Sequence, residues 1–205
     1  MTTFSYLFRA LRKFSMSIEN NFCSIISLII LNGNSVKFEK GLKSNGIPKV
    51  DVWKYGSMTI GTSFKMNNGK NHNMIGRQQP CYFIVRNGAK LLIGNNVGIS
   101  ATAIVCSDTI TIGNDVKIGG NTVIYDTDFH SLEAESRLNI EKDQANTFSA
   151  PVHIGNNVFI GAHSTILKGV TIGDYSIIGA GSVISKSIPS KEIWAGNPAK
   201  FIRTI

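Results

Sequence analysis

Isoleucine returns at every sixth position through the last third of the chain, and the positions between are mostly polar, small or glycine. The run without a miss consists of Ile154, Ile160, Ile166, Ile172, Ile178 and Ile184. Four of these six isoleucines are followed directly by glycine. An α-helix turns about 240° in six residues, so it would scatter the isoleucines over three faces, and each interior glycine would cost about 1 kcal/mol.

The spacing instead predicts short strands separated by bends, each strand turning one isoleucine inward. A long flat strand does not fit, because a glycine at every sixth place interrupts the two-residue alternation of side chains. A unit of six residues cannot bury its apolar face alone, so it must stack on copies of itself. Successive coils would lie about 4.8 Å apart as parallel strands. The predicted fold is therefore all-β, a parallel solenoid.

The repeat extends upstream in a less regular form. In a first group the residues are six apart, and they are Ile93, Ile99 and Val105. After a slip of one residue the spacing resumes at Ile112, Ile118 and Ile124. A fainter group precedes both and consists of Ile47, Trp53, Ile60 and Met66. Between Ile124 and Ile154 the pattern is absent. We therefore expect a solenoid over residues 36–205 with a long loop at 125–153 and a tail at 190–205.

The N-terminal segment follows a different period. Apolar residues at helical spacing alternate with basic ones, and they are Phe4, Leu7, Phe8, Leu11, Phe14 and Ile18, with Arg9, Arg12 and Lys13 between them. This predicts an amphipathic helix. The apolar run 22–31 is too short for a membrane-spanning helix, which needs about 20 residues. We expect residues 1–35 to form a helix and first strand that cap the solenoid, with docking of residues 4–18 on the inner membrane as the alternative.

The charge is unevenly distributed. Residues 1–90 contain 13 Lys and Arg against 3 Asp and Glu, whereas residues 91–205 contain 8 against 10. No groove-reading helix, zinc finger or aromatic RNA-binding motif accompanies the basic half, so no nucleic-acid partner is expected. Anionic small molecules or an anionic membrane fit this charge better. The three cysteines are far apart and form no CxxC pair, which favours a reducing compartment such as the cytoplasm.

The interruption of the repeat holds the candidate chemistry. Its first section, IYDTDFHSLEAESR, places Asp126, Asp128, His130 and Glu133 within eight residues. A histidine on a loop that projects from a rigid scaffold can accept a proton at neutral pH, and an adjacent carboxylate can orient its ring. A solvated surface histidine is the simpler alternative. The histidines are too scattered to favour a zinc site, so no metal is expected.

The repeat, the DTDFH loop and the ending IWAGNPAKFIR together resemble the hexapeptide-repeat acyltransferases, which have left-handed β-helix folds. The nearest branch is the sugar O-acetyltransferases, which include galactoside and maltose acetyltransferases and enzymes of capsule and lipopolysaccharide biosynthesis. The resemblance extends from about Leu92 to the C-terminus. The first 90 residues do not match the N-terminal region of the galactoside and maltose enzymes, so the acceptor specificity is not carried over.

The resemblance assigns roles to individual positions. His130 matches the family's catalytic base, with Asp128 or Asp126 as the group that orients it. The acyl donor in the family is acetyl-CoA, laid along the late coils, which implicates Gly161, Ala162, Gly179, Ala180, Lys200 and Arg203, with a backbone N–H near Gly161 as oxyanion donor. Ser100 and Asp126 match positions that face the acceptor. His163 matches a residue that lines the cofactor channel or a subunit contact.

The implied reaction is transfer of an acetyl group from acetyl-CoA to a hydroxyl of a sugar, either a small molecule or a glycolipid, by a homotrimer in the cytoplasm. Three alternatives stay open. One is an N-acetyltransferase that acts on an amino-sugar nucleotide. Another is a γ-type carbonic anhydrase, which would need three zinc-binding histidines. The third is a β-solenoid scaffold without activity, for which the long interruption has no purpose.

Overall fold

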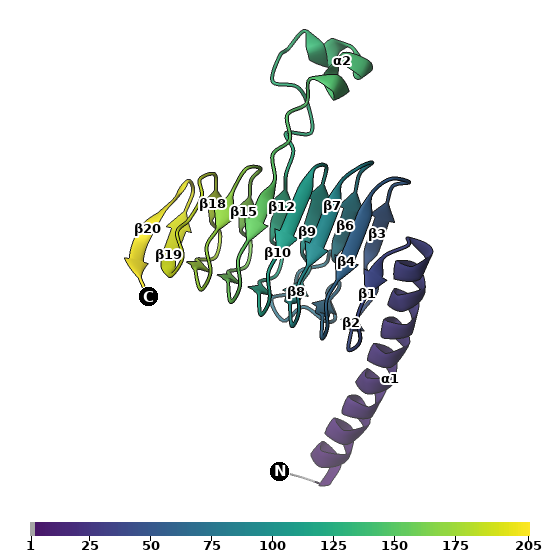
Figure 1. Cartoon of the computed structure of the whole chain (residues 1–205). Helices are drawn as coiled ribbons and strands as arrows, with labels where there is room; N and C mark the ends of the chain where they lie inside the picture. The colour runs from purple at the N-terminus through teal and green to yellow at the C-terminus, as the bar shows by residue number, and fades with distance from the viewer. Residues whose placement is uncertain (1–2) are drawn as a thin grey trace.

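A computed structural model describes residues 3–205 and shows a three-sided column of short parallel strands (Figure 1). Each coil contributes one strand to each side. Sheet A consists of β1 (Lys37–Phe38), β4 (Ser57–Ile60), β7 (Lys90–Ile93), β10 (Thr109–Ile112), β13 (Val152–Ile154) and β16 (Thr171–Ile172). Sheet C consists of β3 (Lys49–Val52), β6 (Tyr82–Val85), β9 (Ala103–Cys106), β12 (Val123–Tyr125), β15 (Thr165–Ile166) and β18 (Val183–Ile184).

Sheet B is the longest side because two terminal strands extend it. It consists of β2 (Lys43–Asn45), β5 (Lys65–Asn67), β8 (Gly98–Ser100), β11 (Lys117–Ile118), β14 (Phe159–Ile160), β17 (Ile177–Ile178), β19 (Glu192–Gly196) and β20 (Ala199–Thr204). Only the β19–β20 pair is antiparallel among these. The chain is a left-handed parallel β-helix, which confirms the fold expected from the sequence.

The isoleucine repeat builds the core of the column. The parallel register places Ile112 beside Ile154 and Ile154 beside Ile172, so one full coil in the late part takes 18 residues. All six isoleucines of the regular run are buried. Burial of one such side chain contributes about 1.5–3 kcal/mol. Because each isoleucine packs on those of the neighbouring coils, the contacts between successive coils stabilise the column.

The frame predicted for the early coils is partly wrong. Ile104, not Val105, is buried and pairs with Ile124, because the turn after β8 is one residue shorter than the six-residue frame assumes. Ile47 and Trp53 are 43% and 45% exposed, whereas Ile60 and Met66 are buried as predicted. Irregular turns in the first coils therefore shift which residues point inward.

The turns between sheets A and B share one backbone conformation. The first contains Gly41 with a φ of 86°, and each later one contains a residue with φ between 54° and 63°; these residues are Ser63, Asn96, Asp115, Asn157, Tyr175 and Lys191. This left-handed conformation is sparsely populated by residues other than glycine, although asparagine and aspartate adopt it more readily. A single residue in that conformation turns the chain sharply from one side of the column to the next, which keeps each side short.

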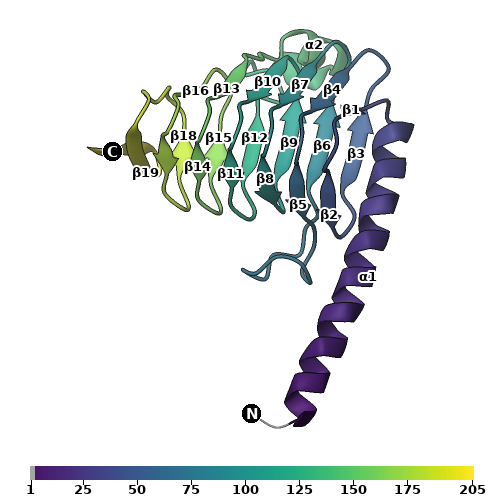
Figure 2. The ribbon, with the colours of Figure 1, turned by 60° about the horizontal axis from the view of Figure 1, so that its bottom comes forward.

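The helix α1 (Thr3–Gly33) lies at the N-terminal end of the column and includes residues 22–31, for which a strand was predicted. The strand prediction is wrong because Cys23, Ser27 and Leu31 recur at four-residue spacing on one helical face, where they are buried. The N-terminal half of α1 leans away from the coils (Figures 1 and 2). By length and composition alone α1 could cross a membrane, a test that core helices and leader segments also pass.

Two insertions interrupt the coils at different corners. Residues 68–81, the short loop, join β5 to β6 at the corner between sheets B and C (Figure 2). Residues 126–151, the arm, join β12 to β13 at the corner between sheets C and A. The arm stands well clear of the column and contains a 3-10 helix, η1 (Ser136–Leu138), and α2 (Ile140–Ala145) (Figure 1).

Candidate active site

His130 lies on the outgoing segment of the arm, and a carboxylate holds one side of its ring. The distance from His130 Nδ1 to Asp143 Oδ2 is 2.7 Å, and the histidine side chain is 70% exposed. Phe129, directly before it, has a φ of 65°, a strained conformation that turns the following side chain. If Nδ1 carries the proton donated to the carboxylate, then Nε2 presents a lone pair to the surroundings.

Asp143 is itself fixed from two directions. Its second oxygen, Oδ1, accepts the backbone N–H of Ser131 at 2.6 Å. It lies on α2, whose start is capped where the Asn139 side chain accepts the N–H of Lys142 at 3.0 Å. The hydrogen bond from His130, followed by that from the Ser131 N–H, lowers the pKa of Asp143 below its ordinary value of 3.8. Asp143 is therefore an ionised partner for the histidine.

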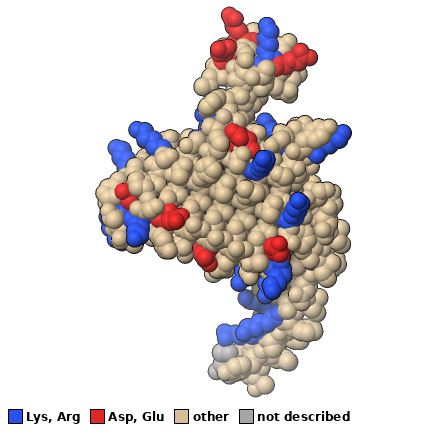
Figure 3. All heavy atoms as spheres, viewed as in Figure 1, with Lys and Arg blue, Asp and Glu red and all other residues tan. Residues whose placement is uncertain are grey.

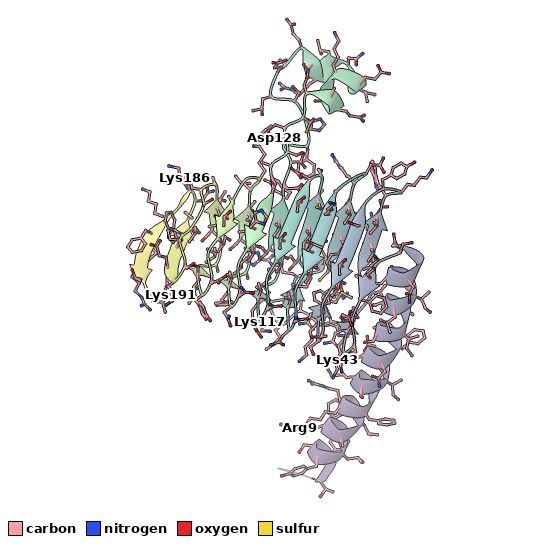
Figure 4. The ribbon with its side chains drawn as sticks, viewed as in Figure 1. Arg9, Lys43, Lys117, Asp128, Lys186 and Lys191 are labelled. Atoms are coloured by element: carbon pink, nitrogen blue, oxygen red, sulfur yellow. The ribbon has the colours of Figure 1, made fainter. Side chains whose placement is uncertain are left out.

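The structure corrects the choice of orienting carboxylate. Asp128 does not hold His130, because its Oδ1 forms an ion pair with Lys168 Nζ at 2.6 Å at the base of the arm (Figure 4 labels Asp128). Asp143 was missed because it lies 13 residues beyond His130 and only the fold of the arm brings it back. The available signal was the helix start at Asn139 followed by acidic residues.

Asp126 has a structural position that differs from its expected contact with the acceptor. It is fully buried, and it accepts the backbone N–H groups of Ser107 at 2.6 Å and Asp108 at 2.9 Å. Burial is the main cause that raises the pKa of its carboxyl group, against the lowering effect of these two hydrogen bonds. Asp126 thus fastens the arm to the preceding coil and neither faces solvent nor orients His130.

His130 opens onto a cavity of about 690 Å³ between the arm and the corner of sheets C and A. The coils contribute Trp53, Arg86 and Ser107 to its wall, and the arm contributes Arg137 and Asp143. Most of the lining residues are polar, and the aromatic side chains of Trp53 and Phe129 are among them. Such a wall can hold a small polar ligand beside the free edge of the histidine.

The glycine–alanine turns expected to hold the acyl donor lie at another corner, between sheets B and C. Gly161 and Gly179 stack on successive coils there, and a Cβ at Gly161 would lie 2.5 Å from the backbone nitrogen of Ala180. These glycines are therefore required for coil stacking. The Gly161 N–H already donates to Ile178 O at 2.8 Å, so it is not a free oxyanion donor. Within residues 3–205, the Ala162 N–H has no acceptor.

His163 lies at the same corner and is held by two side chains. Arg77 of the short loop donates to His163 Nε2 from Nε at 3.2 Å and from Nη2 at 3.0 Å. Because Nε2 accepts, the ring proton lies on Nδ1, and the Asn121 amide, whose Nδ2 lies 3.1 Å from Nδ1, must then turn its oxygen toward that proton. This arrangement requires a neutral ring, and the sequence had given no sign that Arg77 reaches this position.

The remaining predicted positions also belong to sheet B. Lys200 and Arg203 are exposed on β20, and Lys200 pairs with Ala195, the residue that a Cβ at Gly179 would meet. Ser100 ends β8, where its hydroxyl accepts from Asn67 Nδ2 at 3.1 Å. None of these residues lines the His130 cavity. Within one chain, the predicted base and the predicted donor positions therefore occupy different corners of the column.

Comparison with known proteins adds to this picture. Residues 151–186 match the family described as bacterial transferase hexapeptide (six repeats). Over 129 residues the chain is 41% identical to the galactoside O-acetyltransferase of Escherichia coli K12. The matched region covers 62% of this chain and 60% of that enzyme. The chain spans 60% or less of the length of the curated relatives it matches.

Two solved structures share the fold over most of the chain. AntD, an N-acyltransferase from Bacillus cereus, has a TM-score of 0.65 at 17% identity, covering 87% of this chain and 88% of that one. The polySia-specific acetyltransferase NeuO has a TM-score of 0.55 at 23% identity, covering 82% and 81%. At these identities the likeness concerns the fold alone. Together with the repeat, the arm and the tail, these matches confirm that this chain is similar to the hexapeptide-repeat acetyltransferases.

Proposed function

We propose that the protein is an O-acetyltransferase that moves an acetyl group from acetyl-CoA to a hydroxyl of a sugar, with His130 as the general base. The observation that carries this proposal is the His130–Asp143 pair, which leaves Nε2 free beside a polar cavity. The similarity to a galactoside O-acetyltransferase supports the reaction class. A transferase of this kind fits the cytoplasm, where acetyl donors and sugar precursors are available.

The chemistry follows from the histidine pair. His130 Nε2 takes the proton of the acceptor hydroxyl while that oxygen forms its bond to the acetyl carbonyl carbon. Asp143 stabilises the imidazolium that results and keeps Nε2 turned to the cavity. His130 then returns the proton to the departing sulfur as the carbon–sulfur bond breaks. A base of this kind contributes about 10²–10⁴ to the rate.

The corner between sheets B and C fits an extended amide-containing donor. Acetyl-CoA, when bound, supplies a thioester carbonyl that is already activated for attack. Ala162 and Ala180 present only methyl groups there, and the free N–H of Ala162 can donate to an amide or to a developing oxyanion. Lys200 and Arg203 on β20 would meet the phosphates.

Because this corner and His130 are apart in one chain, we propose that a complete site forms between neighbouring copies in a homotrimer. The arm then places His130 against the donor groove of the next copy. Ser100 would contribute to the acceptor side of that groove. The arm standing clear of its own column agrees with such a contact (Figure 1).

The decisive experiment measures thiol release from acetyl-CoA over a panel of sugars and nucleotide sugars, for the wild type and His130→Ala. We expect acceptor-dependent release that falls at least about a hundredfold in the variant, with acetyl-CoA binding intact. Equal activity of the variant would remove His130 as the base. Absence of both turnover and coenzyme binding in the wild type would favour a scaffold without activity.

An N-acyltransferase acting on an amino sugar is the second candidate, and the fold shared with AntD keeps it open. The product distinguishes the two reactions, because mild alkali cleaves an O-acetyl ester and leaves an N-acetyl amide. Labelled acetyl released from the product by alkali supports O-acetylation. Retained label would show that the acceptor atom is nitrogen.

We also propose that α1 rests on an anionic membrane surface. Its outward side is an apolar stripe at spacings of three and four residues, each member more than half exposed; the stripe consists of Phe4, Leu7, Leu11, Phe14, Ile18, Phe22, Ile25 and Ile29. Basic residues lie along α1 and the coils beside it (Figure 3). Apolar contact and attraction to anionic lipids act together in such helices.

Sedimentation with vesicles tests this surface. The wild type should bind vesicles that contain anionic phosphatidylserine and bind neutral phosphatidylcholine vesicles less. Replacing Leu11, Phe14 and Ile18 with serine should abolish binding, because these side chains supply the apolar contact. If the wild type stays in the supernatant and the serine variant instead lowers the oligomeric state, the stripe serves contacts between copies.

A further inference from the structure

The cavity beside His130 has an excess of positive charge. Two arginines line it, Arg86 from the corner after β6 and Arg137 from the arm, and the one lining carboxylate is Asp143. Both oxygens of Asp143 are already hydrogen-bonded, to His130 and to the Ser131 N–H. Within residues 3–205, no carboxylate lies at ion-pair distance from either arginine.

Arg86 is held in place without being neutralised. Its guanidinium carbon lies 5.8 Å from the centroid of the Phe129 ring, so the aromatic face directly before His130 orients the arginine. Arg137 uses one N–H group on Ser131 O at 2.7 Å, which fixes its side chain within the arm. Planar guanidinium groups fixed in this way bind carboxylates and phosphates through paired hydrogen bonds.

The cavity also offers a surface for a sugar ring. Trp53, Arg86, Ser107 and Thr127 occupy the same corner on four successive coils, following β3, β6, β9 and β12 (Figure 1). Three coil spacings of about 4.8 Å give this row a length of roughly 14 Å, enough for two linked sugar-sized groups. The half-exposed Trp53 ring provides a flat apolar face at the end away from the arm.

We infer that the acceptor is an acidic sugar whose carboxylate or phosphate binds Arg86, which places a hydroxyl near His130, while the Trp53 face packs against a second, linked group. This inference rests on the proposed acetyltransferase function and names its substrate class. Trp53 and Arg86 come from the N-terminal coils, outside the part of the chain in which the family motifs lie. The early coils thus determine which acceptor the site selects.

Calorimetric binding of matched sugars tests the inference without requiring turnover. Glucose, glucuronic acid and glucose 1-phosphate are titrated into the wild type, Arg86→Gln, Arg86→Lys and the control Lys117→Gln. Lys117 lies on the edge of the column opposite Asp128 (Figure 4). We expect one anionic sugar to bind at least about tenfold more tightly than glucose, because hydrogen bonds to charged groups are worth that much or more.

Arg86→Gln should remove this preference, Arg86→Lys should keep part of it, and Lys117→Gln should leave it intact. The preferred anion shows whether a carboxylate or a phosphate is recognised. Equal binding of all three sugars to the wild type, or a preference that survives in Arg86→Gln, overturns the inference. Anion binding that depends on Arg86 without any acetyl transfer contradicts only the reaction. Acetyl transfer to neutral sugars that Arg86→Gln does not change contradicts only the acidic acceptor.

Discussion

Asp128, near the base of the arm, and Asp143, on its tip, have different partners, although the sequence pointed only to Asp128 of these two as a partner for His130. Asp128 is neutralised by Lys168, and Asp143 pairs with the histidine. A carboxylate held by a lysine has little capacity left to stabilise an imidazolium. The role of each carboxylate therefore depends on the basic side chain that it contacts.

Asp143→Asn should lower kcat by about 10- to 100-fold, because the amide cannot stabilise the protonated imidazole. The acid limb of kcat/KM against pH should also move to lower pH, which a loss of arm packing alone would not produce. Asp128→Asn is the matched control and should leave the shape of the pH profile unchanged. The reverse result for the two variants would return the positioning role to Asp128.

The lowered pKa of Asp143 also predicts how the arm responds to acid. A carboxyl group with a depressed pKa in the folded state stabilises it fully above the unfolded value and loses this effect as the pH falls. The Ser131 amide proton, which Asp143 accepts, should therefore be protected from exchange at neutral pH, relative to the intrinsic rate of an open loop at the same pH, and should lose this protection below about pH 4. A protection factor that does not change with pH would show that Asp143 does not hold the arm.

Asp126→Ala should destabilise the protein by about 2–4 kcal/mol, because it leaves the partly buried N–H groups of Ser107 and Asp108 without an acceptor. Glu141→Ala on the exposed side of α2 is the control and should change stability by less than about 0.5 kcal/mol. Urea unfolding measures both. A small effect of Asp126→Ala would mean that water reaches the two amides.

At the scale of elements, the close stacking of the corners limits the size of the side chains that a coil can have there. Gly161→Ala should cost about 1–3 kcal/mol, because the added Cβ would meet the backbone of the next coil. Gly181→Ala has open space but a φ of 72°, so about 1 kcal/mol of backbone strain is expected there. Gly33→Ala at the end of α1 has neither problem and serves as control. Thermal unfolding that ranks the three differently would contradict the stacking argument.

The helix α1 is a second element, and the local spacing of its apolar residues determines its form. Its apolar positions keep helical spacing through residues 22–31, so the helix continues where a capping strand was predicted. Its packing face and its outward apolar stripe lie on opposite sides. The local sequence therefore determines that this segment is a helix, whereas the role of its outward apolar stripe depends on what that stripe contacts outside the chain.

At the scale of the whole molecule, a site shared between copies predicts complementation. His130→Ala and a variant that blocks the donor corner, Ala180→Trp, should each be inactive alone. Refolded together in equal amounts, they should recover about one quarter of wild-type activity, because a quarter of the interfaces in a random trimer then combine two intact halves. No recovery in mixed oligomers would place base and donor within one chain.

The sequence by itself determined the coil, the long interruption and the histidine within it. A six-residue period is a local property, because each isoleucine must point inward whatever lies further away. The regular late coils were therefore predicted residue by residue, while uneven turns displaced Val105, Ile47 and Trp53 from their expected positions.

Only the tertiary structure decided the partners. Asp143 reaches His130 because the arm folds back on itself, Arg77 reaches His163 across 86 residues, and Arg86 joins the cavity through stacking of the coils. Such contacts depend on chain paths between distant residues, and no local period encodes them. For this reason the sequence could predict His130 as the base, but it could not predict that Asp143 holds it or that Arg86 lies in the same cavity.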